Sequence, residues 1–425
     1  MSGSGAGDIA LYENINDMRA NTANEGDLAL VYNINNLQGL FQYTNNNWEI
    51  APTGLTATNE YVVDSIFWGA NGVEQGTLQV NTDLTTNQVK IKAQVYNDLS
   101  YLELDHSVTN LDGAFFNFIN LTAIPNVDTS NVINMSNMFW NCFNLKAVPN
   151  LNTSKVTNMS YMFLRCYNLT SIPNFNTSKV NNMYGTFTGC YNLTFIPNFD
   201  TSNVTNTAAI FSNCASLFTV PNFNTSNVTD MGHMFHGCTN LTTIPDFDTS
   251  NVTSIWRMFS NCVNLTTVPN FNTSKAIIMY ETFSNCYKLE NIPNFNTNKI
   301  SNMLSAFANC QSLVNIPNLN LANTVDMQRM FYNCRNLVDV PLLDMNNAVW
   351  ISGMFYSCYN LSNVSIANIV NSLPNANQLS NRYVTDIGLS LNKFDDDQLR
   401  ILNNKGYIDA IPQPVGLTYN ITYTI

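Results

Sequence analysis

Apolar residues recur along most of this chain with a fixed period of 24 residues. Ten cysteines keep that step from Cys142 to Cys358, eleven phenylalanines from Phe115 to Phe355, and ten prolines from Pro125 to Pro341. A period of this length is typical of stacked repeats, in which each unit contacts its neighbours rather than one central core. We therefore expect the repeated residues to build a scaffold, and recognition to fall to positions that vary between repeats.

Within one repeat the pattern predicts a two-turn helix and a short strand. Apolar residues in Pro149–Ile172 follow the i, i+3, i+4, i+7 spacing of a helix face, at Met159, Met162, Phe163 and Cys166. Residues 169–175 are expected to form a short strand that ends beside Pro173, because proline has no N–H for a ladder. A polar Asn-Thr-Ser-Lys turn suits the start of the helix. So short a helix is unstable alone in water, so stacking must supply the stability.

The predicted fold class is an α/β solenoid of about eleven turns over residues 105–365, closed by atypical end repeats. Phe118 stands at a cysteine position, and Ser365 stands at a proline position. Residues 366–425 are expected to form a C-terminal α/β cap. In that cap, Asp395-Asp396-Asp397 begins a helix and Gly406 ends it, since acidic side chains favour a helix N-terminus.

The first hundred residues lack the repeat. Residues 1–58 are predicted to form a small, mostly β domain, and residues 59–104 a β-rich linker. The expected strands are 28–32, 40–43 and 48–50 in the domain and 89–95 in the linker, with a short helix at 14–21.

The cysteines are interpreted as a file of buried free thiols, that is, a column with one cysteine from each stacked coil. Equivalent residues of stacked turns lie about 4.8 Å apart, and their parallel side chains keep the sulfurs too far apart for a relaxed disulfide. A file also cannot bring four sulfurs to one tetrahedral zinc ion. We expect no disulfides and no metal.

Composition excludes several functions. Only 11% of the 425 residues are charged, and the net charge is −12. No basic patch appears, so nucleic-acid binding is not expected. No stretch approaches the roughly 20 apolar residues of a membrane span, so membrane insertion is not expected either. The first residues, MSGSGAGDIALYENIND, lack the basic and apolar regions of an export signal.

Residues that could support catalysis are scattered. His233, His236 and Cys238 form a His-x-x-His-x-Cys motif, but the histidines fall on variable surface positions and the cysteine on the buried file. Asp200, Asp246 and Asp248 are interpreted as turn residues. No phosphate loop, nucleophile elbow or Cys–His pairing is present. The sequence therefore predicts a protein that is not an enzyme and needs no cofactor.

Variable positions beside each cysteine supply the candidate ligand-binding residues. Stacking aligns the residues one after and two before each cysteine into stripes, and aromatic side chains gather at both ends of them. Such side chains stack on sugar rings or anchor a protein partner. The candidates are Trp140, Phe143, Tyr161, Tyr167 and Tyr191 near the first turns, and Tyr332, Arg335, Tyr356 and Tyr359 near the last. The alternative is that they merely cover the edge of each turn.

Units such as NTSNVTDMGHMFHGCTNLTTIP resemble the BspA-type leucine-rich-repeat surface proteins of bacteria and their protist relatives. The resemblance covers residues 107–364, with Ile-Pro-Asn where the family more often has a plain strand. It implies a right-handed solenoid with cell-surface or protein-binding roles, and no catalytic residues.

The N-terminal segments EGDLALVY and LQGLFQYTNNNWEIAPTG are similar to modules of phage tail proteins from low-GC hosts. Together these features favour a tail protein of the virion. Its N-terminal domain would bind other tail proteins, and its solenoid would bind a host-surface glycan or protein, with a homo-oligomer left open. The alternatives are a bacterial surface adhesin of the BspA type and a structural decoration or spacer.

Overall fold

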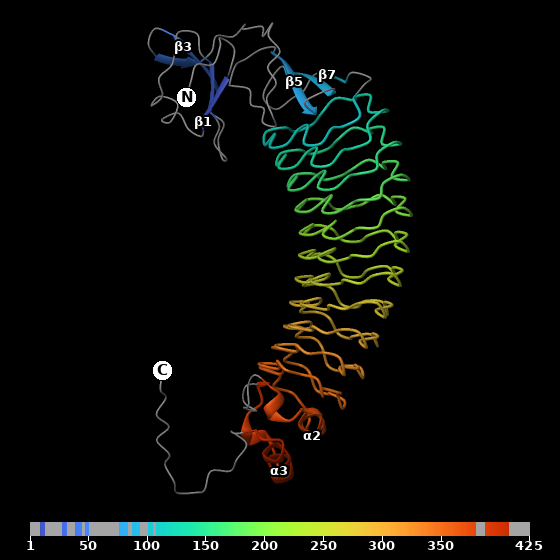
Figure 1. Ribbon diagram of the computed structural model, residues 1–425, viewed down its shortest axis with the longest axis vertical. Helices are drawn as coiled ribbons and strands as arrows, with labels where there is room; N and C mark the ends of the chain where they lie inside the picture. The colour runs from blue at the N-terminus through green and yellow to red at the C-terminus, as the bar shows by residue number, and fades with distance from the viewer. Residues whose placement is uncertain are drawn as a thin grey trace. The chain divides into compact units, whose positions relative to one another are not determined.

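The structure is a computed structural model. It describes the backbone of seven strands within residues 1–107, and then residues 108–379 and 387–407. The chain divides into two compact units, Met1–Val228 and Thr229–Ile425. Each unit contains stacked 24-residue coils, so the predicted repeat solenoid is confirmed (Figure 1).

The first unit begins with two small sheets. The strands are β1 (Ile9–Tyr12), β2 (Leu28–Val31), β3 (Gly39–Thr44), β4 (Asn47–Ile50), β5 (Gly76–Asp83), β6 (Asn87–Ala93) and β7 (Tyr101–Leu104). In the first sheet β1 pairs in parallel with β2, and β2, β3 and β4 pair antiparallel in turn. In the second sheet β6 lies between β5 and β7. The four predicted strands correspond to β2, β3, β4 and β6. The expected helix at 14–21 lies outside the described residues.

The predicted two-turn helix in each coil is wrong. Its residues form successive β-turns, in which Met162 N–H donates to Met159 O over 3.2 Å and Cys166 N–H to Phe163 O over 3.0 Å. Tyr161 and Arg165, the third residues of these turns, have φ of 56° and 60°. This is the geometry of type II turns. Two residues with positive φ, four positions apart, are incompatible with an α-helix. The buried residues nevertheless keep the i, i+3, i+4, i+7 spacing of a helix, which explains the wrong prediction.

The N–H groups between these turn bonds reach the following coil. Tyr161 N–H donates to Tyr184 O and Phe163 N–H to Thr186 O, each over 2.8 Å. Each donor therefore bonds a carbonyl 23 residues ahead. Along the turn segment, one set of N–H groups therefore bonds within the coil, and the N–H groups between them bond to the next coil.

The left-handed pair recurs in every coil, from Gly113 and Asn117 to Gly353 and Ser357. The second member of the pair is Asn or Gly in nine of the eleven coils. These residue types tolerate positive φ best. The first member varies widely and includes Tyr161, His233 and Arg257.

The predicted short strand is also wrong in detail. Coils pair through isolated parallel bridges such as Asn158 with Asn182, and in the described coils the stretch before the proline has a single bridge, Asn315 with Asp339, rather than a continuous strand. Beside the proline the chain makes a three-residue turn, in which Phe175 N–H donates to Pro173 O over 3.0 Å. The Asn-Thr-Ser corner is an Asx turn rather than a helix start, since Asn152 Oδ1 accepts from Ser154 N–H over 3.1 Å.

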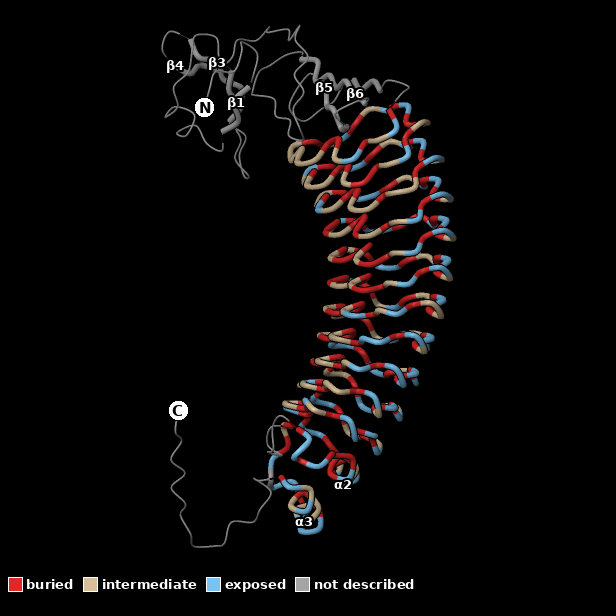
Figure 2. The backbone as a smooth tube through the Cα atoms, in the orientation of Figure 1, coloured by how far each residue is buried: buried red, intermediate tan, exposed pale blue. Residues whose placement is uncertain are grey.

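Phenylalanine rings form the centre of both units. In the first unit the rings from Phe115 to Phe211 stack with centroids 5.2 to 5.9 Å apart. In the second, the rings from Phe235 to Phe355 stack at 5.4 to 5.7 Å. Each of these rings is at most 1% exposed. Figure 2 shows buried and exposed segments alternating in the same way around successive coils.

The cysteines are buried and free, which confirms the predicted thiol files. The Cys166 thiol donates to Phe139 O over 3.1 Å, and Cys286 donates to Phe259 O over 3.1 Å. The acceptor is the carbonyl of the stacked phenylalanine one coil back. Burial raises the pKa of the Cys190 and Cys286 thiols well above the usual range. The files are therefore neutral hydrogen-bond donors inside a dry interior.

Asparagine amides form a second ladder at the left-handed positions. Asn285 Nδ2 donates to Asn261 Oδ1 over 2.8 Å, and the same bond links Asn309 to Asn285 and Asn333 to Asn309 over 2.7 Å. Arg335 Nε donates to Asn333 Oδ1 over 2.8 Å and ends the ladder, because Ser357 replaces asparagine in the next coil.

In the first unit the amide ladder is broken. Asn141 Nδ2 donates to Asn117 Oδ1 over 2.6 Å, but Asn141 Oδ1 is buried without a partner. The next coil has Arg165 where an asparagine would donate.

Short helices follow the last coil of the second unit. They are α2 (Asn363–Ser372), the 3-10 turns η1 (Ala376–Gln378) and η3 (Leu391–Lys393), and α3 (Asp396–Asn404). The Ser365 hydroxyl accepts from Val340 N–H and donates to Val338 O, so α2 satisfies backbone groups of a preceding coil. The helix α3 begins at the predicted acidic triplet, where Asp395 forms a capping box with Gln398. It ends before Gly406, whose φ is 85°.

The buried thiols predict a loss of stability at alkaline pH. Folding raises the thiol pKa above the unfolded value of about 8.5, so stability is present below that pH and is lost as pH rises above it. Each thiol should lower the free energy of unfolding by about 1.4 kcal/mol per pH unit once the unfolded state ionises. Urea titrations at pH 7.5 and 10 in reductant measure this, with Cys190→Ala expected to have the shallower pH dependence. An identical dependence in that variant would contradict the prediction.

The orphaned Asn141 carbonyl predicts a stabilising substitution. In Arg165→Asn the new amide should donate to Asn141 Oδ1, and asparagine also tolerates the positive φ of this position. We expect a gain of about 1 kcal/mol in the free energy of unfolding. Denaturant unfolding of this variant beside Arg165→Ala separates the amide from the loss of arginine. Equal stability of the two variants would show that the ladder contributes nothing here.

Candidate functional site

The exposed aromatic side chains lie at positions that vary between coils. Tyr191 is 45% exposed, Tyr287 42%, Tyr356 52% and Tyr359 65%, whereas the stacked phenylalanines are almost fully buried. The scaffold and the accessible surface therefore use different positions of the same repeat.

Three of the predicted residues form an aromatic ladder in the first unit. Phe143 stacks on Tyr167 with centroids 4.8 Å apart, and Tyr167 on Tyr191 at 4.9 Å, with interplanar angles of 5° and 12°. Beside it, Asn192 Nδ2 donates to Asn168 Oδ1 over 3.2 Å. The ladder presents the exposed Tyr191 ring beside a row of amides.

Trp140 and Tyr161 belong to a separate group, which corrects the single cluster expected from the sequence. Their rings stack with centroids 5.9 Å apart. Phe116 and Tyr184, which the sequence interpretation missed, contact them edge-on at 5.0 and 4.9 Å. Burial and the hydrogen bond with Tyr184 raise the pKa of Tyr161 to about 12. This group is packed against itself and is only partly exposed.

The four candidates in the last coils have different roles. Tyr332 and Tyr356 stack at 5.3 Å. Arg335 terminates the amide ladder, so it is held by the scaffold. Tyr359 is exposed and its hydroxyl donates to Ser357 Oγ over 3.0 Å. The structure thus brings Tyr332 and Tyr356 together and gives Arg335 a structural function.

A polar and aromatic group that the sequence interpretation missed lies across three coils of the second unit. We call it the Trp256 cluster; it consists of His233, His236, Trp256, Arg257, Tyr280 and Glu281. The His233 ring meets the Trp256 ring edge-on with centroids 4.1 Å apart, and the His236 ring at 5.3 Å.

An ion pair anchors the other side of the cluster. Arg257 Nε lies 2.7 Å from Glu281 Oε2, and an Arg257 amino group donates to the Tyr280 hydroxyl over 2.9 Å. The guanidinium also lies over the Tyr280 ring, 5.0 Å from its centroid. Glu281 beside it raises the pKa of the Tyr280 hydroxyl. The charges compensate each other, and three side chains are held in fixed positions.

Electrostatics keep both imidazoles neutral near pH 7. Burial, His236 and Arg257 together lower the pKa of His233 to about 4. Burial and Arg257 also lower the pKa of His236. At neutral pH the Trp256 cluster therefore presents hydrogen-bonding groups without net charge.

Backbone conformation explains how these side chains meet. His233, Arg257 and Glu281 occupy the first left-handed position of successive coils, with φ of 58°, 53° and 50°. Trp256 lies on Gly232, where any Cβ would overlap the indole. A sequence signal existed: His233, Arg257 and Glu281 are three large polar side chains at this position in adjacent coils, whereas the coils on either side have Ala209 and Ser305.

The metal interpretation of His233, His236 and Cys238 finds no geometric basis in the described residues, where no group of three potential ligands comes together. Cys238 is fully buried with the other thiols, whereas both histidines are partly exposed. The carboxylates Asp200 and Asp248 accept from Ser202 and Ser250 N–H over 3.0 and 2.9 Å, as turn residues do.

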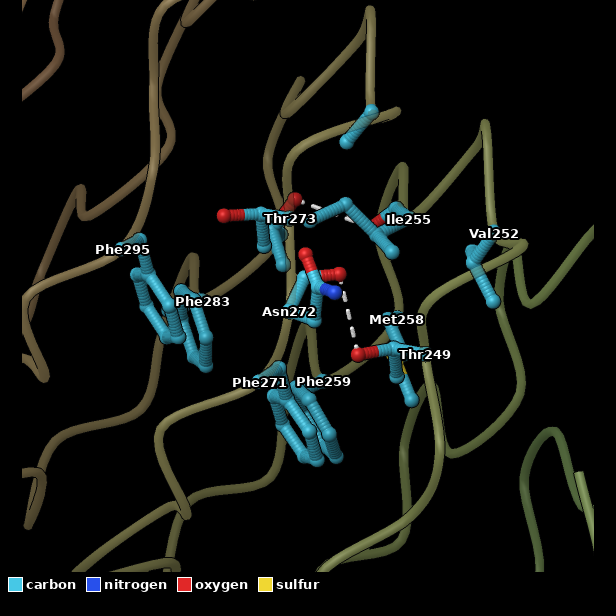
Figure 3. Close-up of a pocket in the computed structure, with 12 residues that line it drawn as sticks. Thr249, Val252, Ile255, Met258, Phe259, Phe271, Asn272, Thr273, Phe283 and Phe295 are labelled. Carbon is cyan, nitrogen blue, oxygen red and sulfur yellow. Dashed lines mark hydrogen bonds between the residues drawn. The ribbon is translucent and has the colours of Figure 1, made fainter. Parts of the chain in front are cut away.

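A small pocket of the second unit belongs to the scaffold (Figure 3). It is lined by apolar side chains such as Phe259 and Phe283, and the hydroxyl of Thr249 there donates to Asn272 O over 3.0 Å. Ala276 and Thr282 line it, and both are smaller than Val252 and Met258 at the same positions of the preceding coil. No helix within the described ranges is long and apolar enough to cross a membrane.

Comparison with known proteins identifies relatives of the repeat region. The family described as "Mycoplasma protein of unknown function, DUF285" matches residues 109–219, 192–291 and 263–369. Among curated proteins none matches. The N-terminal likeness to phage tail proteins has no support in these comparisons.

Two solved structures are similar at 16% identity. The T. pallidum leucine-rich repeat protein TpLRR aligns over 44% of this chain and 90% of its own, with a TM-score of 0.32. A leucine-rich repeat protein from Eubacterium ventriosum ATCC 27560 aligns over 67% of this chain and 95% of its own, with a TM-score of 0.36. Both are described as leucine-rich repeat proteins, and at these TM-scores the likeness carries no further argument.

The seat of Trp256 on Gly232 predicts a local effect of Gly232→Ala. The added methyl displaces the indole, which is the end of a flexible side chain, so Trp256 should move into solvent while the coil stays folded. We expect its fluorescence to shift to the red and the unfolding midpoint to change little. The spectrum of Trp256 is obtained by subtracting that of a matched Trp256→Phe variant. An unchanged Trp256 spectrum would show that the indole does not rest on this glycine.

Proposed function

The chain belongs to the DUF285 family, and we propose that it is a non-enzymatic recognition protein displayed on the cell surface, like the BspA-type proteins its repeats resemble. The observation that carries this proposal is the division of each coil into buried repeated positions and exposed variable ones. A solenoid of this kind offers an extended surface for a partner.

The exposed aromatic residues are the contact sites in this proposal. The ladder that ends at Tyr191 and the pair formed by Tyr332 and Tyr356 present rings already ordered by stacking. Ordered aromatic side chains lose little entropy on binding and dominate many interfaces. Tyr359 extends the second surface.

The remaining parts have supporting roles in the proposal. The helices α2 and α3 cap the apolar end of a right-handed stack, and the sheets β1–β4 and β5–β7 connect the solenoid to its attachment point. The surface protein is favoured over the virion protein because the family match covers the repeats that resemble BspA-type surface proteins, whereas no comparison supports the N-terminal likeness to phage tail proteins. A spacer without a partner is the remaining competitor.

Surface display and adhesion test the proposal together. Antibodies against the chain should label intact cells of the source organism without permeabilisation and should not label purified phage particles. Beads coated with the full chain should adhere to the organism's natural substrate cells, and Tyr191→Ala combined with Tyr356→Ala and Tyr359→Ala should reduce adhesion at least fivefold.

Matched controls make the outcome clear. Substituting the exposed Val314 and Leu342 by alanine removes apolar side chains elsewhere on the coils and should leave adhesion unchanged. Labelling of phage particles alone would restore the virion interpretation. Surface labelling without adhesion would favour the spacer, and adhesion that does not depend on the tyrosines would show that they are not the contact sites.

A further inference from the structure

We propose that the Trp256 cluster is a binding site for an uncharged carbohydrate. This inference rests on the proposed recognition function and names one ligand class and one site for it. The site lies apart in sequence from the tyrosine surfaces and uses side chains that the scaffold does not need.

The scaffold argument comes from the other coils. The positions of Trp256 and Arg257 are held by Ala208 and Ala209 in one coil and by Leu304 and Ser305 in another, and those coils close with the same turn bonds. A coil therefore folds without aromatic or charged groups at these positions.

The backbone conformation of these coils positions the side chains of the site. Positive φ costs a non-glycine residue about 1 kcal/mol or more, and three successive coils of the second unit place His233, Arg257 and Glu281 there. Every coil has a residue with positive φ at this position, so the strain belongs to the scaffold, and the choice of side chain distinguishes these three coils. In the left-handed conformation His233 contacts Trp256, and Arg257 contacts Glu281 and Tyr280.

Charge compensation selects the ligand class. An anionic ligand would need an unpaired cation, but Arg257 is neutralised by Glu281 at 2.7 Å. A cationic ligand would need a free carboxylate, which the same pair removes. An uncharged ligand that offers both hydroxyl groups and an apolar C–H face satisfies the cluster best.

The aromatic group supplies the platform. Trp256 is 36% exposed, and its indole is supported by Gly232 and by the His233 ring, which lies perpendicular to it. The negative face of an indole attracts the C–H groups of a sugar ring. Around it, Arg257 and Glu281 remain 33% and 25% exposed, so their hydrogen-bonding atoms are accessible to hydroxyl groups. A preformed platform with fixed polar neighbours needs little reorganisation on binding.

A protein partner is the competing occupant, because tryptophan, tyrosine and arginine also dominate protein interfaces. The paired charges argue for the sugar. A protein hot spot gains from burying its arginine fully against a partner, whereas here the guanidinium is already satisfied by Glu281 and Tyr280.

The test is a titration of the purified full chain with uncharged oligosaccharides, namely maltohexaose, laminarihexaose, chitohexaose and mannohexaose, followed by calorimetry and by Trp256 fluorescence. We expect at least one to bind with a dissociation constant below 1 mM, a working threshold of about −4 kcal/mol. Trp256→Ala and Gly232→Ala should each weaken that binding at least tenfold. Trp350→Ala removes another exposed tryptophan of the same unit, 44% exposed, and should bind as the parent does.

A second variant, Glu281→Gln, tests the role of the ion pair. Glu281→Gln leaves Arg257 unpaired, so it should weaken the uncharged ligand and create binding of oligogalacturonate, an anionic control that the parent does not bind. If no uncharged sugar binds the parent, or if Trp256→Ala and Trp350→Ala lose binding equally, the site is not a carbohydrate site. Capture of a surface protein that depends on Trp256, without sugar binding, would replace the proposal with the protein interface.

These outcomes separate the site from the general function. Surface display and adhesion without sugar binding would reject the carbohydrate site alone. Sugar binding by a chain that never reaches the cell surface would reject the surface protein and retain the site.

Discussion

In the turn segment of successive coils, alternate N–H groups donate to carbonyls 23 residues ahead, and each unit depends on these bonds. Tyr161, Phe163 and Arg165 all make such a bond, to Tyr184, Thr186 and Thr188. These bonds require left-handed residues at fixed places, because only then do successive peptide groups point alternately along the turn and toward the next coil. Each bond contributes about 1 kcal/mol net. The stack therefore derives its cohesion from backbone geometry as well as from apolar burial.

This geometry explains why like residues lie over one another. Because these bonds keep the same register in every coil, each side chain lies on its counterpart 24 residues away. Each position therefore needs a residue type whose side chain can pack or hydrogen-bond within a column of its own kind. Phenylalanine does so by stacking, cysteine by donating to the carbonyl of the coil before, and asparagine by both donating and accepting. A residue that cannot do both breaks the row, as Arg165 does beside Asn141. Arg335 shows the repair, since its guanidinium replaces the missing amide.

Much of this arrangement could be predicted from the sequence. The period, the buried thiols, the strands β2, β3, β4 and β6, and the helix α3 follow from spacing and residue type. The helix within each coil could not, because two type II turns bury residues at the same i, i+3, i+4, i+7 spacing as a helix. The distinguishing signal was the asparagine or glycine before eight of the ten cysteines.

The candidate site was harder to predict for a related reason. The stripes beside the cysteines correctly aligned Tyr167 with Tyr191 and Tyr332 with Tyr356. They also grouped Trp140 with Phe143, although the rings face different neighbours. The Trp256 cluster combines three different positions of the repeat, and only the turn geometry shows that these positions converge. A helix would have directed Trp256 and Arg257 about 100° apart around its axis.

The two left-handed positions of each coil have diverged because they face different surroundings. The second position adjoins the buried cysteines and forms the amide ladder. A residue other than asparagine or glycine there has an unfavourable positive φ and also loses the ladder hydrogen bond. The first lies at the edge of the coil, where a larger side chain loses only the preference, about 1 kcal/mol. That lower cost leaves the first position open to tyrosine, histidine, arginine and glutamate. Because stacking repeats the position in each successive coil, neighbouring substitutions combine into one surface. The backbone therefore allows recognition residues to accumulate at the first left-handed position of successive coils and excludes them from the second, four residues later.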